Sequence, residues 1–344
     1  MGIFDRLRRT FSPRTAEPAP FVLTDVQQLT PDEFDRLRAA RGVPEPVLRS
    51  FLELLTLRQV PADRLDSTLR EMAEQYDRLR QQLEALASDD PVVHALEAQA
   101  VTALSHAAWR RVESLLNDAA AQSIRAAEGA PEDARHNRLL SAAAANASNG
   151  NLKESQLLYR EAVGYYRHAV ELVPAGEDAV LAGYLVSLGH GLILCGDDAG
   201  AEGPLTRALA IRERDQNPEA LGRAECLYYV GWLYHNQGRY AEAEPLDTRC
   251  LAIREKVLGP EHPATAATLN NLALLYKHQG RYAEAEPLYT RVLAISEKVL
   301  GPEHPATAVT PNNLAGLYHA QRRYAEAEPL FTAMSRHQGE GARP

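Results

Sequence analysis

Paired carboxylates are the first arrangement in this sequence that could do chemistry. Two carboxyl groups held close together can act as general acid and base, or they can bind a divalent cation. Here the members of each pair alternate with alanine on a segment that has helical periodicity, which is typical of a solvated helix face. We therefore interpret the pairs as surface charge; they are Glu242/Glu244, Glu284/Glu286 and Glu326/Glu328.

Histidines and cysteines give no metal-ligand pattern. His262 and His304 each lie beside a proline, 42 residues apart, which favours a turn or capping role. The three thiols, Cys195, Cys226 and Cys250, are scattered and odd in number, which indicates a reducing compartment, and Cys250 falls at an apolar position where it should pack. The sequence has no Gly-rich phosphate loop, His-Glu-x-x-His helix or Gly-x-Ser-x-Gly turn. We predict no catalytic residue, no metal, no cofactor and no enzymatic activity.

An internal repeat organises the second half of the chain. The segment Arg-Tyr-Ala-Glu-Ala-Glu-Pro-Leu occurs at 239–246, 281–288 and 323–330, which gives a period of 42 residues. A period of this length indicates a solenoid, in which each unit buries its apolar face by stacking on its neighbours.

Each unit is predicted to be a helix-turn-helix hairpin. Leu269, Leu272, Ala273 and Tyr276 are spaced as one stripe of a helix, which Gly280 ends. A second amphipathic pattern follows and ends at the Leu-Gly-Pro of 300–302. Alanines on both helices should allow close approach while tyrosines fill the space beside them.

These units resemble the tetratricopeptide repeat. The Leu-Gly-Pro-Glu-His-Pro connectors at 258–263 and 300–305, with Asn-Asn-Leu-Ala at 270–273 and 312–315, resemble the kinesin-light-chain type. The resemblance implies an all-α, right-handed superhelical solenoid. We place its repeats near 138–174, 178–213, 220–257, 263–299 and 305–335, with a decayed one at about 91–127.

The predicted domain organisation has four parts. Residues 1–20 form a flexible tail, 21–135 an N-terminal helical region, 136–336 the repeat array and 337–344 a disordered tail. Residues 1–11 are either a basic amphipathic helix that touches a membrane surface or a disordered tail.

The N-terminal region is predicted to be helical. A capping box at Thr30–Glu33 starts one helix, a second follows Pro46, and a third follows Pro61. The heptad seam at 65–86 is either the inner face of an intramolecular bundle or the interface of a homodimer.

Charge and hydropathy limit the partners. A net charge of −9 with no basic domain argues against nucleic acid. No apolar run is long enough to span a bilayer, and the first residues lack the apolar core of a secretion signal, so a cytoplasmic location is expected.

The resemblance also implies a binding surface. First-helix positions off the packing stripe line the concave face of such arrays, and aromatic and amide side chains there suit an extended peptide. For the asparagines, hydrogen bonding within or between helices, as at Asn270 or Asn312, is an equal alternative. The implied groove residues are Tyr228, Tyr229, Trp232, His235, Asn270, Asn271, Leu274, Lys277, Asn312, Asn313 and His319.

Three departures from the repeat pattern lead to local expectations. Asp247 replaces the residue found at Tyr289, so it should be partly exposed or ion-paired. Pro311 replaces Leu269, so the last first helix should begin near Thr310. The Asn-Gly-Asn of 149–151 should break or bend its helix.

Two functional hypotheses follow. The first is a non-enzymatic scaffold or adaptor that binds an extended segment of a protein partner. The alternative is a regulatory module whose N-terminal helices dock to a membrane or a multi-protein complex, with the repeats as a stiffener.

Overall fold

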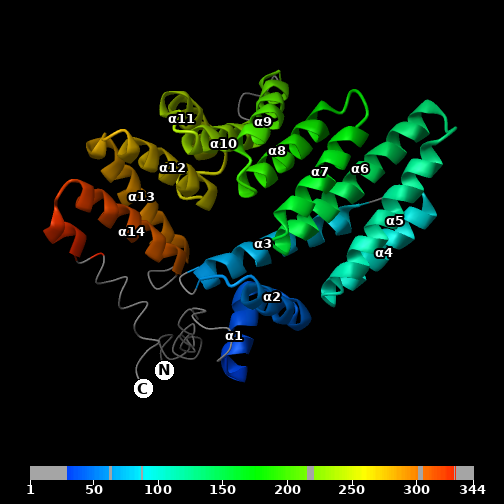
Figure 1. The fold of residues 1–344 in the computed structure, drawn as a ribbon, viewed down its shortest axis with the longest axis horizontal. Helices are drawn as coiled ribbons and strands as arrows, with labels where there is room; N and C mark the ends of the chain where they lie inside the picture. The colour runs from blue at the N-terminus through cyan, green and yellow to red at the C-terminus, as the bar shows by residue number, and fades with distance from the viewer. Residues whose placement is uncertain are drawn as a thin grey trace, which may run out of the picture.

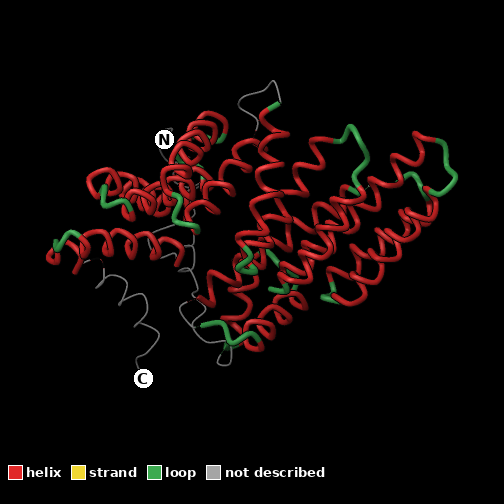
Figure 2. Tube along the Cα trace, turned by 45° about the horizontal axis from the view of Figure 1, so that its top comes forward, coloured by secondary structure: helices red, strands yellow, loops and turns green. Residues whose placement is uncertain are grey.

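A computed structural model describes residues 29–61, 64–86, 88–214, 221–300, 305–328 and 330. Within these residues the chain forms fourteen α-helices, α1 to α14, and a further helical stretch at 324–328. The described residues contain no strand (Figure 2). The first three are α1 (Pro31–Arg41), α2 (Glu45–Leu57) and α3 (Leu65–Ala85). The all-α prediction is confirmed. The tails at 1–20 and 337–344, including the amphipathic segment at 1–11, lie outside the described residues.

The N-terminal helices begin where the sequence predicts. The Thr30 hydroxyl accepts a hydrogen bond from the Glu33 amide, and the Glu33 side chain accepts one from the Thr30 amide, which completes the capping box of α1. Gly42 ends that helix in the left-handed conformation, with φ of 63°.

The heptad seam of α3 is buried inside the chain. Leu69, Met72 and Leu79 have no exposed surface, and they belong to one core with α2, α4, α5 and Leu152 of α6. In the same core, Phe51 stacks on Trp109 with ring centroids 5.7 Å apart. Of the two interpretations of the seam, the intramolecular bundle matches this burial, and a homodimer through 65–86 would have to expose it.

Helical hairpins follow one another from α4 onward. In Figure 1 they form an arc that runs from α4 to α14, with α3 on its inner side. Helix α3 packs against α6 and also contacts α14. The hairpins are α4/α5 (Pro91–Ser105, Trp109–Ala127), α6/α7 (Glu132–Ser155, Tyr159–Leu172), α8/α9 (Asp178–Leu194, Asp198–Glu213), α10/α11 (Leu221–Asn236, Tyr240–Val257) and α12/α13 (Pro263–His278, Tyr282–Leu300), and α14 is Pro305–Ala320.

Two local predictions are wrong. Helix α14 begins at Pro305 and continues past residue 311, so it does not start near Thr310. Helix α6 is continuous through Gly150, so the predicted break there does not occur. Gly150 has a packing role instead, because a Cβ at this position would overlap the ring of Tyr166. The predicted domain boundary at 135/136 falls inside α6.

The close contact within each hairpin joins a small residue on the first helix to a larger one sixteen positions later. Gly189 faces Leu205 in the same way as Gly150 faces Tyr166. In α12/α13, Ala273 and Tyr289 are both fully buried in one cluster with Ala285. The helices can approach this closely only because the first-helix residue has little or no side chain.

An arginine at the start of the second helix links neighbouring hairpins. The Arg281 guanidinium contacts Glu284 and Glu244 at 2.7 Å each and lies 4.0 Å from the centroid of the Tyr276 ring. The arrangement recurs one period earlier at Arg239 and one period later at Arg323. Glu242 and Glu284 are more than half exposed, as expected of a solvated face, whereas Glu244 and Glu286 join one hairpin to the next.

Substituting Ala285 tests the close approach. Ala285→Leu inserts a larger side chain where no surface is exposed, and we expect a loss of roughly 1–3 kcal/mol in the free energy of unfolding. The matched control is Ala283→Leu, the same change at an exposed position of α13, which should cost less than about 0.5 kcal/mol. Equal shifts in chemical denaturation would show that the helix phase is wrong.

Removing Arg281 tests the link between hairpins. Arg281→Ala should lower the melting temperature at low ionic strength, and added salt should narrow the difference from the native protein because exposed ion pairs are screened. Arg167→Ala, at an exposed position of α7, is the control and should have little effect at either salt concentration. A salt-independent loss for Arg281→Ala would instead indicate that the contact with Tyr276 dominates.

Candidate functional site

Four rings on α8 and α10 form one aromatic cluster. Tyr228, Tyr229 and Trp232 of α10 have ring centroids 5.3 to 6.5 Å apart. His190 of α8 joins them, 5.0 Å from Tyr229 and 5.9 Å from Trp232. Sequence reasoning missed His190, although it lies one period of 42 residues before Trp232.

The rings of this cluster are partly buried. Tyr229 and Trp232 pack against the apolar core of α7 to α10. Burial raises the pKa of Tyr228 and of Tyr229, so both hydroxyls stay protonated at neutral pH and can donate hydrogen bonds. The Tyr228 hydroxyl also interacts with the Asn271 side chain of α12.

One asparagine of α12 and one of α14 form a hydrogen bond between the two helices. The Asn313 amide donates a 2.9 Å hydrogen bond to the side-chain oxygen of Asn270. The alternative of bonding between helices therefore holds for Asn270, with Asn313 as its partner. Asn312 is exposed, and Leu274 is partly buried between these polar groups. This bond uses the Asn270 oxygen and the Asn313 amide, so the Asn270 amide and the Asn313 oxygen remain available for other hydrogen bonds.

Lys277 supplies a positive charge at the end of this row. Its ammonium lies against Gly316 of α14, 3.0 Å from where a Cβ would be. No acidic side chain among the described residues forms an ion pair with it. The Arg254 guanidinium, which lies over the Tyr228 ring, bonds to neutral groups near the start of α12, the Thr268 hydroxyl at 2.7 Å and the Ala264 carbonyl at 2.9 Å.

His235 and His319 are not brought together with the others. The His235 ring packs on Tyr240 of α11 and on His278, with centroids 5.4 and 5.3 Å away. Burial and the nearby His278 lower its pKa, so His235 is neutral at pH 7. His319 is exposed and packs on Tyr324. Both histidines therefore face the second helices of their hairpins.

Helix α3 borders the aromatic cluster on the inner side of the arc. Arg78 of α3 acts electrostatically on Tyr229, and Glu71 of α3 interacts with His190. The first helices α10, α12 and α14 carry most of the residues that the sequence places in a binding groove. We call this predicted surface the α10–α14 groove, with Tyr228, Tyr229, Trp232, Asn270, Asn271, Leu274, Lys277, Asn312 and Asn313 as its residues.

His262 and Cys250 have the roles predicted for them. The His262 Nδ1 atom accepts a hydrogen bond from the Ala264 amide at the start of α12. The buried Cys250 thiol donates to the Ala224 carbonyl oxygen at 3.1 Å. His304 lies outside the described residues. In the part of the chain that is described, no group of three or more potential ligands is placed to hold a metal ion.

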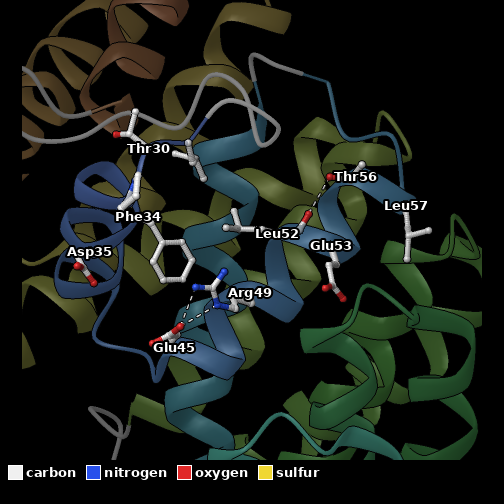
Figure 3. Close-up of a pocket in the computed structure, with 11 residues that line it drawn as sticks. Thr30, Phe34, Asp35, Glu45, Arg49, Leu52, Glu53, Thr56 and Leu57 are labelled. Carbon is white, nitrogen blue, oxygen red and sulfur yellow. Dashed lines mark hydrogen bonds and ion pairs between the residues drawn. The ribbon is translucent and has the colours of Figure 1, made fainter.

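A separate cleft of about 840 Å³ opens between α1 and α2 (Figure 3). The Arg49 guanidinium lies 4.5 Å from the centroid of the Phe34 ring and 2.8 Å from Glu45. Leu57, at the end of α2, is 77% exposed. The remaining lining residues include Asp35, Leu52 and Glu53. The lining thus combines apolar side chains with charged ones, of which Asp35 and Glu45 form ion pairs with Arg38 and Arg49.

No described helix has the length and hydropathy of a membrane span.

Comparison with known proteins identifies the repeats. A family model described as the tetratricopeptide repeat matches residues 180–256, 230–298 and 264–333. Among curated proteins, none matches the chain. Of solved structures, BtubC (BKLC) from P. vanneervenii is similar at 21% identity over 67% of this chain and 94% of that one, with a TM-score of 0.54. The apo form of RapI is similar at 13% identity over 72% and 97%, with the same TM-score.

A further structure agrees with the repeat type inferred from the connectors. A putative kinesin light chain from Podosopora anserina, described by its nearly identical TPR-like repeats, is 25% identical over 58% of this chain and 96% of that one, with a TM-score of 0.50. Residues 180–333 match the tetratricopeptide repeat model, in agreement with the repeats inferred from the sequence.

Proposed function

We propose that this protein is an interaction scaffold that holds an extended segment of a protein partner in the α10–α14 groove. The observation that carries the proposal is the row of unlike groups along that surface: an aromatic cluster, then amides, then the Lys277 ammonium, which pairs with no acidic side chain among the described residues. Tetratricopeptide repeats are in general non-catalytic scaffolds for protein partners, which agrees with this arrangement.

The groups of the groove complement a peptide. Partly buried aromatic rings offer rigid apolar surface at low entropic cost. Asn271 and Asn312 can donate to and accept from peptide groups, while the Asn270–Asn313 bond holds α12 and α14 in register.

Charge favours a partner segment with a carboxylate. Lys277 is partly buried without an acidic partner, and Arg254 beside Tyr228 is bonded only to neutral groups. An acidic side chain on the partner would form a charge-assisted hydrogen bond with Lys277, which is stronger than a bond between neutral groups.

Substituting Lys277 tests this charge. Peptides are selected from a random displayed library on the full chain, and the affinity of the most frequent one is measured by fluorescence anisotropy. Lys277→Gln should weaken binding by about tenfold or more, because a charge-assisted hydrogen bond is lost. Lys298→Gln, on α13 outside the groove, is the matched control and should bind as the native chain does. Equal affinities for both variants would contradict the assignment.

Substituting Asn271 and Trp232 tests the remainder of the row. Asn271→Ala should lose about 0.5–1.5 kcal/mol of peptide binding, as expected for one neutral hydrogen bond. Trp232→Ala should weaken binding more, and its helical circular dichroism must be checked because Trp232 also packs on the core. If both variants bind as tightly as the native chain, the peptide lies elsewhere.

The α1–α2 cleft supports a second candidate function, docking of the N-terminal helices to a protein complex. Its exposed Leu57 and the Glu53 carboxylate fit a basic amphipathic helix of a partner. Under this function, Leu57→Ser or Glu53→Lys would release the chain from its complex while the groove variants would not. Affinity capture with the two sets of variants in parallel distinguishes the two candidates.

A further inference from the structure

Asp247 occupies a core position that other hairpins fill with a large side chain. Tyr166, Leu205 and Tyr289 hold the corresponding place and are fully or almost fully buried. Asp247 is equally inaccessible, with 1% of its surface exposed. The expectation that it would be partly exposed or ion-paired is therefore wrong.

Neither carboxylate oxygen of Asp247 has a hydrogen-bond partner. Oδ1 lies where a Cβ on Gly231 would be, so the carboxyl group is pressed against the backbone of α10. A buried polar atom without a partner destabilises the folded state, and a charged one does so more strongly. The neutral acid is consequently the form that this position tolerates.

The ionisable groups that face Asp247 do not neutralise its charge. Arg254 and Cys250 are on its own helix, and Tyr228 is on α10; among described residues, α12 contributes none. Arg254 is the cation of this set, but its guanidinium is bonded to Thr268 and Ala264 of α12 and lies over the Tyr228 ring at 4.6 Å. Burial, opposed by Arg254, raises the pKa of Asp247 to about 7.

We propose that Asp247 makes the α10/α11 hairpin a proton-sensitive joint in the array, closed when the carboxyl group is neutral and loosened when it is ionised. Ionisation draws water or the Arg254 guanidinium toward the carboxylate. Hydration of the carboxylate requires α10 to separate from α11 at Gly231, and movement of Arg254 breaks its bonds to Thr268 and Ala264 of α12.

The joint acts on the α10–α14 groove through α10. Gly231 is the neighbour of Trp232 and lies one turn from Tyr228, so movement at Gly231 displaces the aromatic cluster. Arg254 adds a second connection, because its guanidinium contacts Tyr228 of α10 and Thr268 of α12. If the guanidinium moved toward Asp247, both contacts would be lost. This step rests on the proposed function, and peptide binding should be tighter at pH 5.5 than at pH 8.

Thermal melting of the full chain tests the joint without any ligand. The folded-state pKa is raised above the ordinary value of 3.8, so the stability contributed by the neutral acid is complete below that value and is lost as pH rises through about 7. Between pH 5 and pH 8 the native chain should lose at least about 2 °C more in melting temperature than Asp247→Asn. Equal pH dependence of the two proteins would overturn the proposal.

Asp247→Tyr is the second variant. A tyrosine opposite a glycine already fits in α6/α7, where Gly150 faces Tyr166, so this change should raise the melting temperature at pH 8. Amide hydrogen exchange should localise the effect. At pH 8, the amides of α10 and α11 should exchange at least about threefold faster in the native chain than in Asp247→Asn. The amides of α6 and α7 should exchange at the same rate in both proteins. Uniform exchange along both hairpins would show that no local joint exists.

Binding of the selected peptide separates this inference from the proposed function. Its affinity for the native chain should fall at least about threefold from pH 5.5 to pH 8 and should stay level for Asp247→Asn. If melting responds to Asp247 but affinity does not, the coupling to the groove is refuted. If no peptide binds at either pH, the groove function fails, and the melting and exchange results alone decide the joint.

Discussion

The structure depends on how closely two antiparallel helices can approach at one residue. A glycine or alanine on the first helix lets the second helix place a ring or a branched side chain directly against its backbone, as Gly150 and Tyr166 do. Interiors are packed at crystal-like density, so this contact fixes the position of one helix on the other. The array is built by repeating that hairpin, and the face of the first helix that is turned away from the contact becomes the inner surface.

Neighbouring hairpins are joined by separate apolar clusters, supplemented by charged contacts, and not by one continuous core. The apolar side chains form several separate clusters along the array, each shared by adjacent helices. The arginine at the start of each late second helix joins its own helix to the preceding hairpin. Because every such link is local, a change in one hairpin alters the array mainly at that point. Asp247 is placed where such a local change would reach the groove.

The periodic parts of the fold could be predicted from the sequence, and the parts that depend on distant contacts could not. Apolar spacing, glycine stops and the 42-residue period predict the hairpins and their order. The role of Gly150 was missed because an Asn-Gly-Asn sequence is typical of a turn, and only Tyr166 across the hairpin explains it. The charge state of Asp247 was missed because burial by α10 is not visible in its own segment.

The same distinction applies to the candidate site. Positions on α10 and α12 follow from the period, yet the period cannot say which groups bond to each other, and Asn270 pairs with Asn313 rather than remaining open. His190 has the right register but lies in a hairpin whose sequence diverges from the later ones. Helix α3 has no counterpart in the repeat at all. The heptad seam of α3 is buried against α2, α4 and α6. This packing holds α3 on the inner side of the arc, where it borders the aromatic cluster. The inner side that α3 does not border is carried by α10, α12 and α14, and this is where we propose that a segment binds, near Lys277.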